Sequence, residues 1–254
     1  MKKYRLSWIV LALLVFFEVS CTANLEVRKK QEEASRNLGE AYLKKRDYTS
    51  ALKEFLKAEA LYPDDPYLQN DLGLTYKAKK KFDLAAKHFK KALEIKPDYG
   101  PAKNNLGTVY LDKKQWDTAI SYFKEVAGNL LYATPHLPLS NLGWAYYNKK
   151  EYTLAEKFYL DALEIEPKFI KALRGLGLTY IALGRDSEAV ATFERAVKNY
   201  PQIAQLYCDL AGAYTLSRDY EKALNAYNKV IELAPDSALA RKARKDAQRI
   251  RNLR

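Results

Sequence analysis

Residues 72–76 read Leu-Gly-Leu-Thr-Tyr, and this Leu-Gly-x-x-Tyr pattern returns at nearly constant intervals along the 254-residue chain. Its glycine position recurs at steps of 34, 34, 36, 34 and 34 residues, with alanine in the last copy. The six positions are Gly39, Gly73, Gly107, Gly143, Gly177 and Ala211. Self-similarity at such a period predicts an array of repeated structural units.

Three further residue types keep the same register. A small residue recurs at Ala51, Ala85, Ala119, Ala155, Ala189 and Ala223, and a ring at Phe55, Phe89, Phe123, Tyr159, Phe193 and Tyr227. Five of the six units close with a proline, at Pro63, Pro97, Pro167, Pro201 and Pro235. Four phases in register over six copies exclude chance as their origin.

Each unit contains two stretches with apolar residues at three- and four-residue spacing, which predicts two amphipathic helices. The glycine of the first helix has no side chain, so the second helix can approach closely, and the alanine serves the same contact from the other side. Proline ends the second helix because it lacks an N–H and clashes with the preceding turn. One helix pair cannot bury its apolar face alone, so stacked pairs share a continuous core.

This pattern resembles the tetratricopeptide repeat family over residues 32–237. The resemblance implies an all-α fold, a right-handed superhelical solenoid of six repeats. Residues 238–254 carry seven basic residues and one acidic residue, with an apolar stripe of Ala240, Ala243, Ala247 and Ile250. We expect them to form a basic capping helix for the last repeat. Such a helix could also rest on anionic lipid headgroups, and the two roles are compatible.

The first twenty residues are typical of an export signal. Basic residues between Met1 and Arg5 precede an apolar run from Leu6 to Phe17. Val19-Ser20-Cys21 resembles the lipobox of bacterial lipoproteins, which implies a signal peptide over 1–20, lipidation of Cys21 and a spacer over 21–31. Glu18 departs from that pattern, and cleavage after Ala23 or an uncleaved anchor are the alternatives. With lipidation, the protein is expected on the periplasmic face of the outer membrane, held there by its lipid anchor.

Composition excludes most other classes of protein. Lys and Arg number 43 against 31 Asp and Glu, and 48% of residues are hydrophobic, which is typical of a folded basic protein. Two histidines and two cysteines leave little for a metal centre or a catalytic triad. We therefore expect no enzyme activity, no cofactor, no metal and no small-molecule substrate. Export argues against a nucleic-acid partner.

The family resemblance places ligand binding on the surface formed by the first helix of each repeat. It implies inner positions six, three and two residues before each repeat glycine, and one and four residues after it. We expect a largely apolar, amide-bearing groove in which asparagines bond a peptide backbone and aromatic rings anchor it. Lys171 and Arg174 of the fifth repeat also fall at these positions. The candidate groove residues are Tyr67, Asn70, Leu74, Asn104, Asn105, Thr108, Leu111, Asn141, Trp144, Tyr147 and Leu178.

A lipoprotein-like signal followed by six repeats resembles the pilotin family of the type IV pilus secretin. The most specific local match runs from Leu131-Tyr132 to Asn141-Leu142-Gly143-Trp144. The resemblance implies a non-catalytic protein-binding lipoprotein whose partner is an outer-membrane secretin that it helps to assemble. The alternatives are a general periplasmic scaffold for envelope or cell-wall machinery and a regulatory subunit of an envelope enzyme.

Overall fold

The computed structural model describes residues 25–129 and 132–252. These residues form helices joined by short turns, with no strand in either range, so the predicted all-α fold is confirmed. The chain divides between Lys113 and Lys114 into two compact units. The predicted signal peptide, Cys21 and Leu131 lie outside the described residues.

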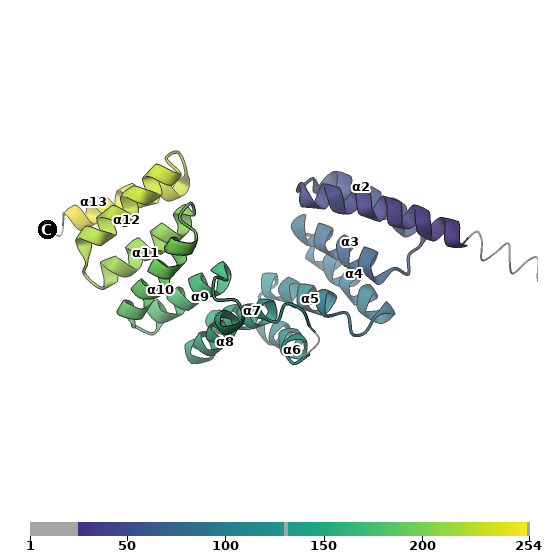
Figure 1. The fold of residues 1–254 in the computed structure, drawn as a ribbon, viewed down its shortest axis with the longest axis horizontal. Helices are drawn as coiled ribbons and strands as arrows, with labels where there is room; N and C mark the ends of the chain where they lie inside the picture. Colours follow the sequence, from purple (N-terminus) through teal and green to yellow (C-terminus); the bar gives the residue numbers. More distant parts are fainter. Residues whose placement is uncertain (1–24, 130–131, 253–254) are drawn as a thin grey trace, which may run out of the picture. The chain divides into compact units, whose positions relative to one another are not determined.

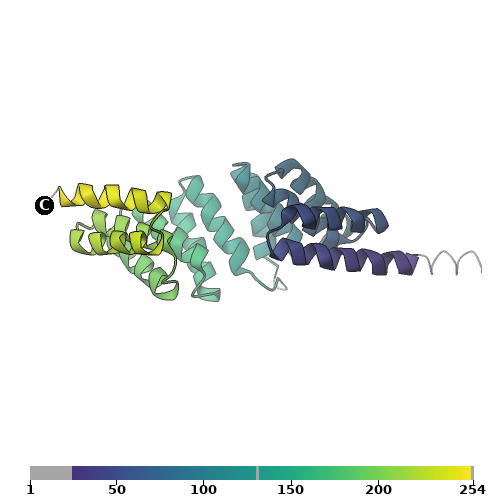
Figure 2. The ribbon, with the colours of Figure 1, turned by 90° about the horizontal axis from the view of Figure 1, so that it is seen from above.

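The first unit contains five helices within its described residues (Figures 1 and 2). Residues 25–44 are helical, so the helix already includes most of the segment expected as a spacer. The others are α2 (Tyr48–Leu61), α3 (Pro66–Ala78), α4 (Phe82–Ile95) and α5 (Gly100–Asp112).

The second unit continues the pattern of consecutive hairpins, which Figure 1 shows stacked one upon the next. Its helices are α6 (Trp116–Ala127), α7 (His136–Asn148), α8 (Tyr152–Ile165), α9 (Ile170–Ala182), α10 (Asp186–Asn199), α11 (Ala204–Leu216), α12 (Tyr220–Leu233) and α13 (Ala238–Arg251). The two additional residues of the third repeat fall between α6 and α7, in the connection between repeats.

The turn inside each hairpin has a common backbone structure. The seventh residue after the repeat glycine has a positive φ in every described repeat, between 58° and 72°. It is Lys or Arg in five repeats and Gly184 in the other. The next N–H donates to the carbonyl of the repeat tyrosine, as from Lys81 to Tyr76 (2.9 Å) and from Arg185 to Tyr180 (2.9 Å). This is the six-to-one bond of a Schellman motif, which ends the first helix of the pair.

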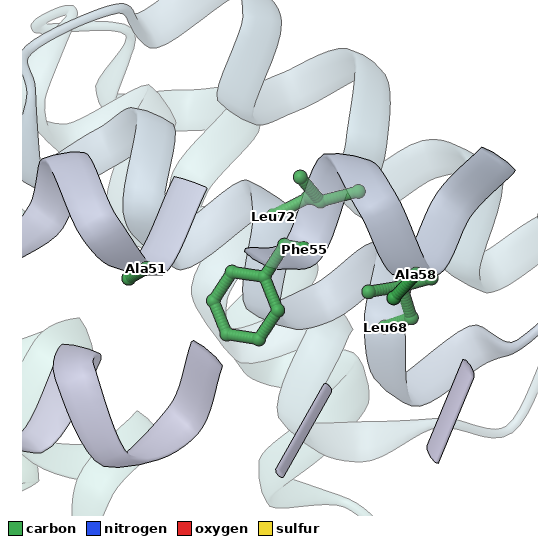
Figure 3. Close-up of a cluster of buried hydrophobic side chains, with 5 residues drawn as sticks. All are labelled: Ala51, Phe55, Ala58, Leu68 and Leu72. Carbon is green, nitrogen blue, oxygen red and sulfur yellow. The ribbon is translucent and has the colours of Figure 1, made fainter. Parts of the chain in front are cut away.

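The core consists of the residues that recur in register. A Cβ built on Gly73 would lie 2.5 Å from Phe89, and one on Gly177 would lie 2.5 Å from Phe193, so the glycine permits the helix approach that the sequence predicted. Figure 3 shows the equivalent ring of the first repeat, Phe55, with the buried side chains around it. This cluster comprises Ala51, Phe55, Ala58, Leu68 and Leu72.

First helices of neighbouring repeats lie closer together than second helices do. In the first unit α3 contacts α5, and in the second α7 contacts α9, α9 contacts α11, and α11 contacts α13. Among α8, α10 and α12, no such contact joins one second helix to the next. First helices therefore form the inner face of each unit, which we define by residues 25–44, α3 and α5 in the first unit and by α7, α9 and α11 in the second.

The C-terminal helix α13 caps the last repeat, as predicted. Ser237 caps its start, since the hydroxyl accepts a hydrogen bond from the Ala240 N–H (3.0 Å). The predicted apolar stripe is buried against α11 and α12, while the basic side chains lie on the opposite face. Across the described ranges, every helix is too short or too polar to cross a bilayer.

Candidate functional site

The candidate groove residues of the first unit differ widely in exposure. Tyr67 is 41% exposed, whereas Asn70, Asn104 and Leu111 are buried. The remaining candidates are half-buried: Leu74, Asn105 and Thr108. Burial removes Asn70 and Asn104 from ready contact with a peptide, whereas Asn105 is half-buried.

Asn70 and Asn105 are joined to each other. The side-chain amide of Asn105 donates to the Asn70 carbonyl oxygen at 2.9 Å, and the Thr108 hydroxyl donates to the Asn105 backbone carbonyl at 2.7 Å. This bond links the first helices of the second and third repeats. The asparagine pair therefore contributes to stacking, and less of its hydrogen-bonding capacity is left for a ligand.

Carboxylates gather around Arg36 on the inner face of the first unit, where the sequence predicted an apolar and amide surface. The guanidinium lies 3.8 Å from Glu32, 3.6 Å from Glu40 and 3.4 Å from Asp65. Burial, reinforced by the charge of Asp65, raises the pKa of Glu32 to about 7. The pKa of Asp71 also rises to about 7, because of burial and the nearby Glu40. The single positive charge of Arg36 does not neutralise the negative charges of the three carboxylates around it, and this favours the protonated form of a buried carboxyl.

Tyr67 belongs to a cluster of rings and cations beside these carboxylates. Its ring meets that of Tyr99 edge to face at 5.2 Å, and Lys96 lies 4.9 Å from the Tyr67 ring centroid. The Lys96 ammonium also donates to the Tyr67 hydroxyl at 2.9 Å. Burial raises the pKa of Tyr99 to about 12. Tyr67 is therefore partly exposed, while Tyr99 and Lys96 contact the rest of its side chain.

The inner face of the second unit contains a pocket of about 350 Å³ between α7 and α9. Three candidate groove residues, Asn141, Trp144 and Leu178, line it together. Its other lining residues are Ser140, Tyr159, Ile170, Lys171, Arg174 and Gly175. The structure therefore brings the candidates of the fourth and fifth repeats into one concave site.

The floor of this pocket results from two departures from the repeat pattern. Tyr159 occupies a position held by phenylalanine in four of the six repeats, and Gly175 occupies one held by Asn or Asp in the other five. A Cβ on Gly175 would lie 2.5 Å from the Tyr159 hydroxyl. The absent side chain therefore makes room for the hydroxyl. Sequence reasoning placed Tyr159 in the core series and missed Gly175.

The rim of the pocket is aromatic and cationic. Trp144 stacks on Tyr147, with ring centroids 5.5 Å apart, and remains 41% exposed, so it is not a core residue. Arg174 is half-buried and donates through Nε to Asp209 at 2.5 Å, which holds the guanidinium in place. Lys171 is exposed and has no ion-pair partner among the described residues.

The remaining reactive side chains are used structurally. Within residues 25–129 and 132–252, no three metal-ligating side chains gather closely enough to hold an ion. His88 is buried and bonded through Nδ1 to Gln69 at 2.8 Å, and burial lowers its pKa. His136 meets Phe169 edge to face at 4.9 Å. Cys208 is buried, and burial raises the pKa of its thiol.

Comparison with protein families identifies tetratricopeptide repeats along most of the chain. Four models, each describing a tetratricopeptide repeat, match residues 31–98, 76–129, 137–169 and 174–238. The chain belongs to the tetratricopeptide repeat family. Members of this family act as protein-interaction scaffolds, which agrees with an inner face that carries an exposed tryptophan and a pocket.

Curated tetratricopeptide relatives match only in part. Anaphase-promoting complex subunit 3 of Schizosaccharomyces pombe is 30% identical over 92 residues, which is 36% of this chain and 14% of that protein. The chloroplastic tetratricopeptide protein PYG7 of Arabidopsis thaliana is 29% identical over 43% of this chain and 37% of its own length. The chain thus spans well under half of these relatives.

Two solved tetratricopeptide structures match almost end to end. PilW, described as a widely conserved type IV pilus biogenesis factor, superposes with a TM-score of 0.77 and 21% identity, over 83% of this chain and 97% of PilW. Pseudomonas aeruginosa PilF has a TM-score of 0.73 and 17% identity, over 86% of this chain and 99% of PilF. These similarities establish a shared fold.

Proposed function

We propose that this protein is a non-catalytic, pilotin-like lipoprotein that binds an outer-membrane secretin and promotes its assembly for type IV pili. The observation that carries the proposal is the match to PilW, which spans 97% of that pilus biogenesis factor. A generic repeat protein can share a few repeats with many others. The match spans nearly the whole of PilW and of PilF, so this chain resembles them in the length of its repeat array as well as in the repeat itself.

The proposed mechanism joins an anchor to a binding face. Acyl chains on Cys21 would hold the N-terminus at the periplasmic face of the outer membrane, and more than one chain is needed for firm attachment. The inner face would hold a secretin segment near the membrane. In the second unit that face offers the exposed Trp144, a residue type that dominates many interfaces, beside a pocket able to accept a side chain.

The test compares secretin multimers in a deletion strain complemented with three versions of the full chain. Wild type should restore heat-resistant secretin multimers in membranes, whereas Trp144→Ala should restore fewer. Leu160→Ala is the matched control, because Leu160 is also a large exposed apolar residue (44%) but lies on α8, a second helix. It should behave as wild type. Equal protein levels of the three versions must be shown by immunoblotting.

Other outcomes assign the protein elsewhere. Unchanged multimers with altered cell shape or septation would favour a general periplasmic scaffold. Unchanged multimers with an altered turnover of a co-purifying enzyme would favour a regulatory subunit. Mass spectrometry of the mature N-terminus tests the anchor separately, since acylated Cys21 is expected and an uncleaved leader or a start beyond residue 21 would exclude it.

A further inference from the structure

We infer that the pocket between α7 and α9 binds a partner segment in which a carboxylate side chain lies next to a bulky apolar side chain. The inference rests on the proposed role in binding a protein partner and specifies the chemistry of that partner. It is drawn from the floor, the rim and the apolar wall of the pocket, which point to the same ligand.

The floor offers a hydrogen-bond donor that the protein itself does not use. Tyr159 is only 1% exposed, yet its hydroxyl has no hydrogen-bond partner within the described ranges. Because Tyr159 lines the pocket, this hydroxyl can donate to a ligand acceptor there. Burial also raises the pKa of Tyr159, so the group is a neutral donor at physiological pH. A ligand acceptor entering beside Gly175 would satisfy it.

The rim selects a negatively charged acceptor. Lys171 lines the pocket without an ion-pair partner among the described residues, and Arg174 lines it while its Nε is bonded to Asp209. The guanidinium carries further N–H groups that can donate to a second carboxylate. A carboxylate accepts several hydrogen bonds at once, so a ligand carboxylate in this pocket can accept from more than one of these donors.

The wall selects an apolar neighbour. Trp144, Ile170 and Leu178 line the same pocket, and the Trp144 ring is fixed by stacking on Tyr147. An immobilised ring loses little conformational entropy when a ligand packs on it. An acidic side chain alone would leave this surface in water. An adjacent Phe, Leu or Met side chain would bury it, so the pocket favours the pair over either residue alone.

The probe is a displayed library of random 12-residue peptides selected on the purified full chain. Enriched peptides should contain an acidic residue beside a bulky apolar one, and exchange of that acid for its amide should weaken binding by about tenfold, as expected for a charge-assisted hydrogen bond. Tyr159→Phe and Lys171→Gln should each reduce retention by a similar factor. Tyr159→Phe should keep its fold, because phenylalanine holds this position in four other repeats.

The matched control is Lys198→Gln, which removes an exposed lysine from α10, a second helix, and should leave retention unchanged. Three results would each overturn the inference: enrichment of basic peptides, retention by Tyr159→Phe and Lys171→Gln equal to that of wild type, or no enrichment over a surface without protein.

A parallel library of overlapping secretin fragments separates the two proposals. If acidic–apolar peptides bind through Tyr159 but no secretin fragment does, the pocket assignment stands and the secretin proposal fails. If secretin fragments bind equally to wild type, Tyr159→Phe and Lys171→Gln, the pocket assignment fails and the secretin proposal stands.

Discussion

The close approach at the repeat glycine can be tested by adding one methyl group at Gly177. The Cβ of Gly177→Ala would lie 2.5, 2.7 and 2.8 Å from three atoms of the Phe193 ring. Carbon atoms in favourable contact are about 3.5–4.0 Å apart, so the ring or the helix must move by about 1 Å. Phe193 is fully buried, so neighbouring side chains enclose the ring.

Two opposing terms set the magnitude. Overpacking a core costs about 1–3 kcal/mol, whereas replacing glycine by alanine within a helix gains up to about 1 kcal/mol. The expected net loss is therefore about 1–2 kcal/mol. Gly212→Ala is the matched control, since Gly212 also lies in a first helix of the second unit but has no atom within 4 Å of its added Cβ. It should gain about 0.5–1 kcal/mol.

The assay is urea unfolding followed by far-ultraviolet circular dichroism. Gly177→Ala should lower the midpoint by about 0.5–1 M, and Gly212→Ala should raise it by a smaller amount. A Gly177→Ala midpoint equal to or above that of wild type would falsify the role assigned to the glycine, because the methyl group would then have met open space.

Three other predictions concern stability. Folding raises the pKa of Glu32 from 4.5 to about 7, so the folded state binds this proton more tightly, and the free energy of unfolding should fall as pH rises between those values. Glu32→Gln should remove about 1–3 kcal/mol of that fall. Urea midpoints with the same pH profile in both proteins would contradict this prediction. Gln69→Ala should lower the free energy of unfolding in urea by about 2–4 kcal/mol, because buried Gln69 donates to Glu59 (3.0 Å) and to the Pro63 carbonyl (2.9 Å) and bonds His88. A loss below about 1 kcal/mol would mean that water replaces these bonds. Residues 150 and 184 both have positive φ in equivalent hairpin turns. Lys150→Gly should therefore stabilise the protein and Gly184→Ala should destabilise it, each by about 0.5–1 kcal/mol in thermal or urea unfolding. Shifts of the same sign would exclude backbone strain as the cause.

The repeat architecture was predictable because each recurring residue has one dominant contact. Glycine at position 73 and the ring at position 89 meet within a single hairpin, only 16 residues apart, so their spacing is fixed by local geometry. In the five repeats that close with a proline, it lies two residues beyond the end of the second helix, as Pro97 does after Ile95. Contacts of this kind depend on helix length and turn structure, both of which the sequence specifies directly.

The candidate binding surface was only partly predictable, because its character depends on how side chains from different repeats combine. The register identified Trp144 and Leu178 as inner residues, and the structure places both in one pocket. It could not separate half-buried from buried asparagines, since these side chains meet across repeats, as Asn70 and Asn105 do. Gly175 could have been found as the one inner position where Asn or Asp gives way to glycine.

The two inner faces differ in chemistry although they share one repeat. In the first unit, carboxylates surround Arg36 and a lysine contacts the exposed Tyr67 ring. In the second, Lys171 has no ion-pair partner among the described residues and lies beside an apolar wall. Stacking alone would favour identical units, because every hairpin must bury the same core. The departures at Tyr159 and Gly175 place in the pocket a hydroxyl that has no hydrogen-bond partner among the described residues. If the proposed ligand bonds this hydroxyl, the irregular positions of the array, rather than its regular ones, mark the site of binding.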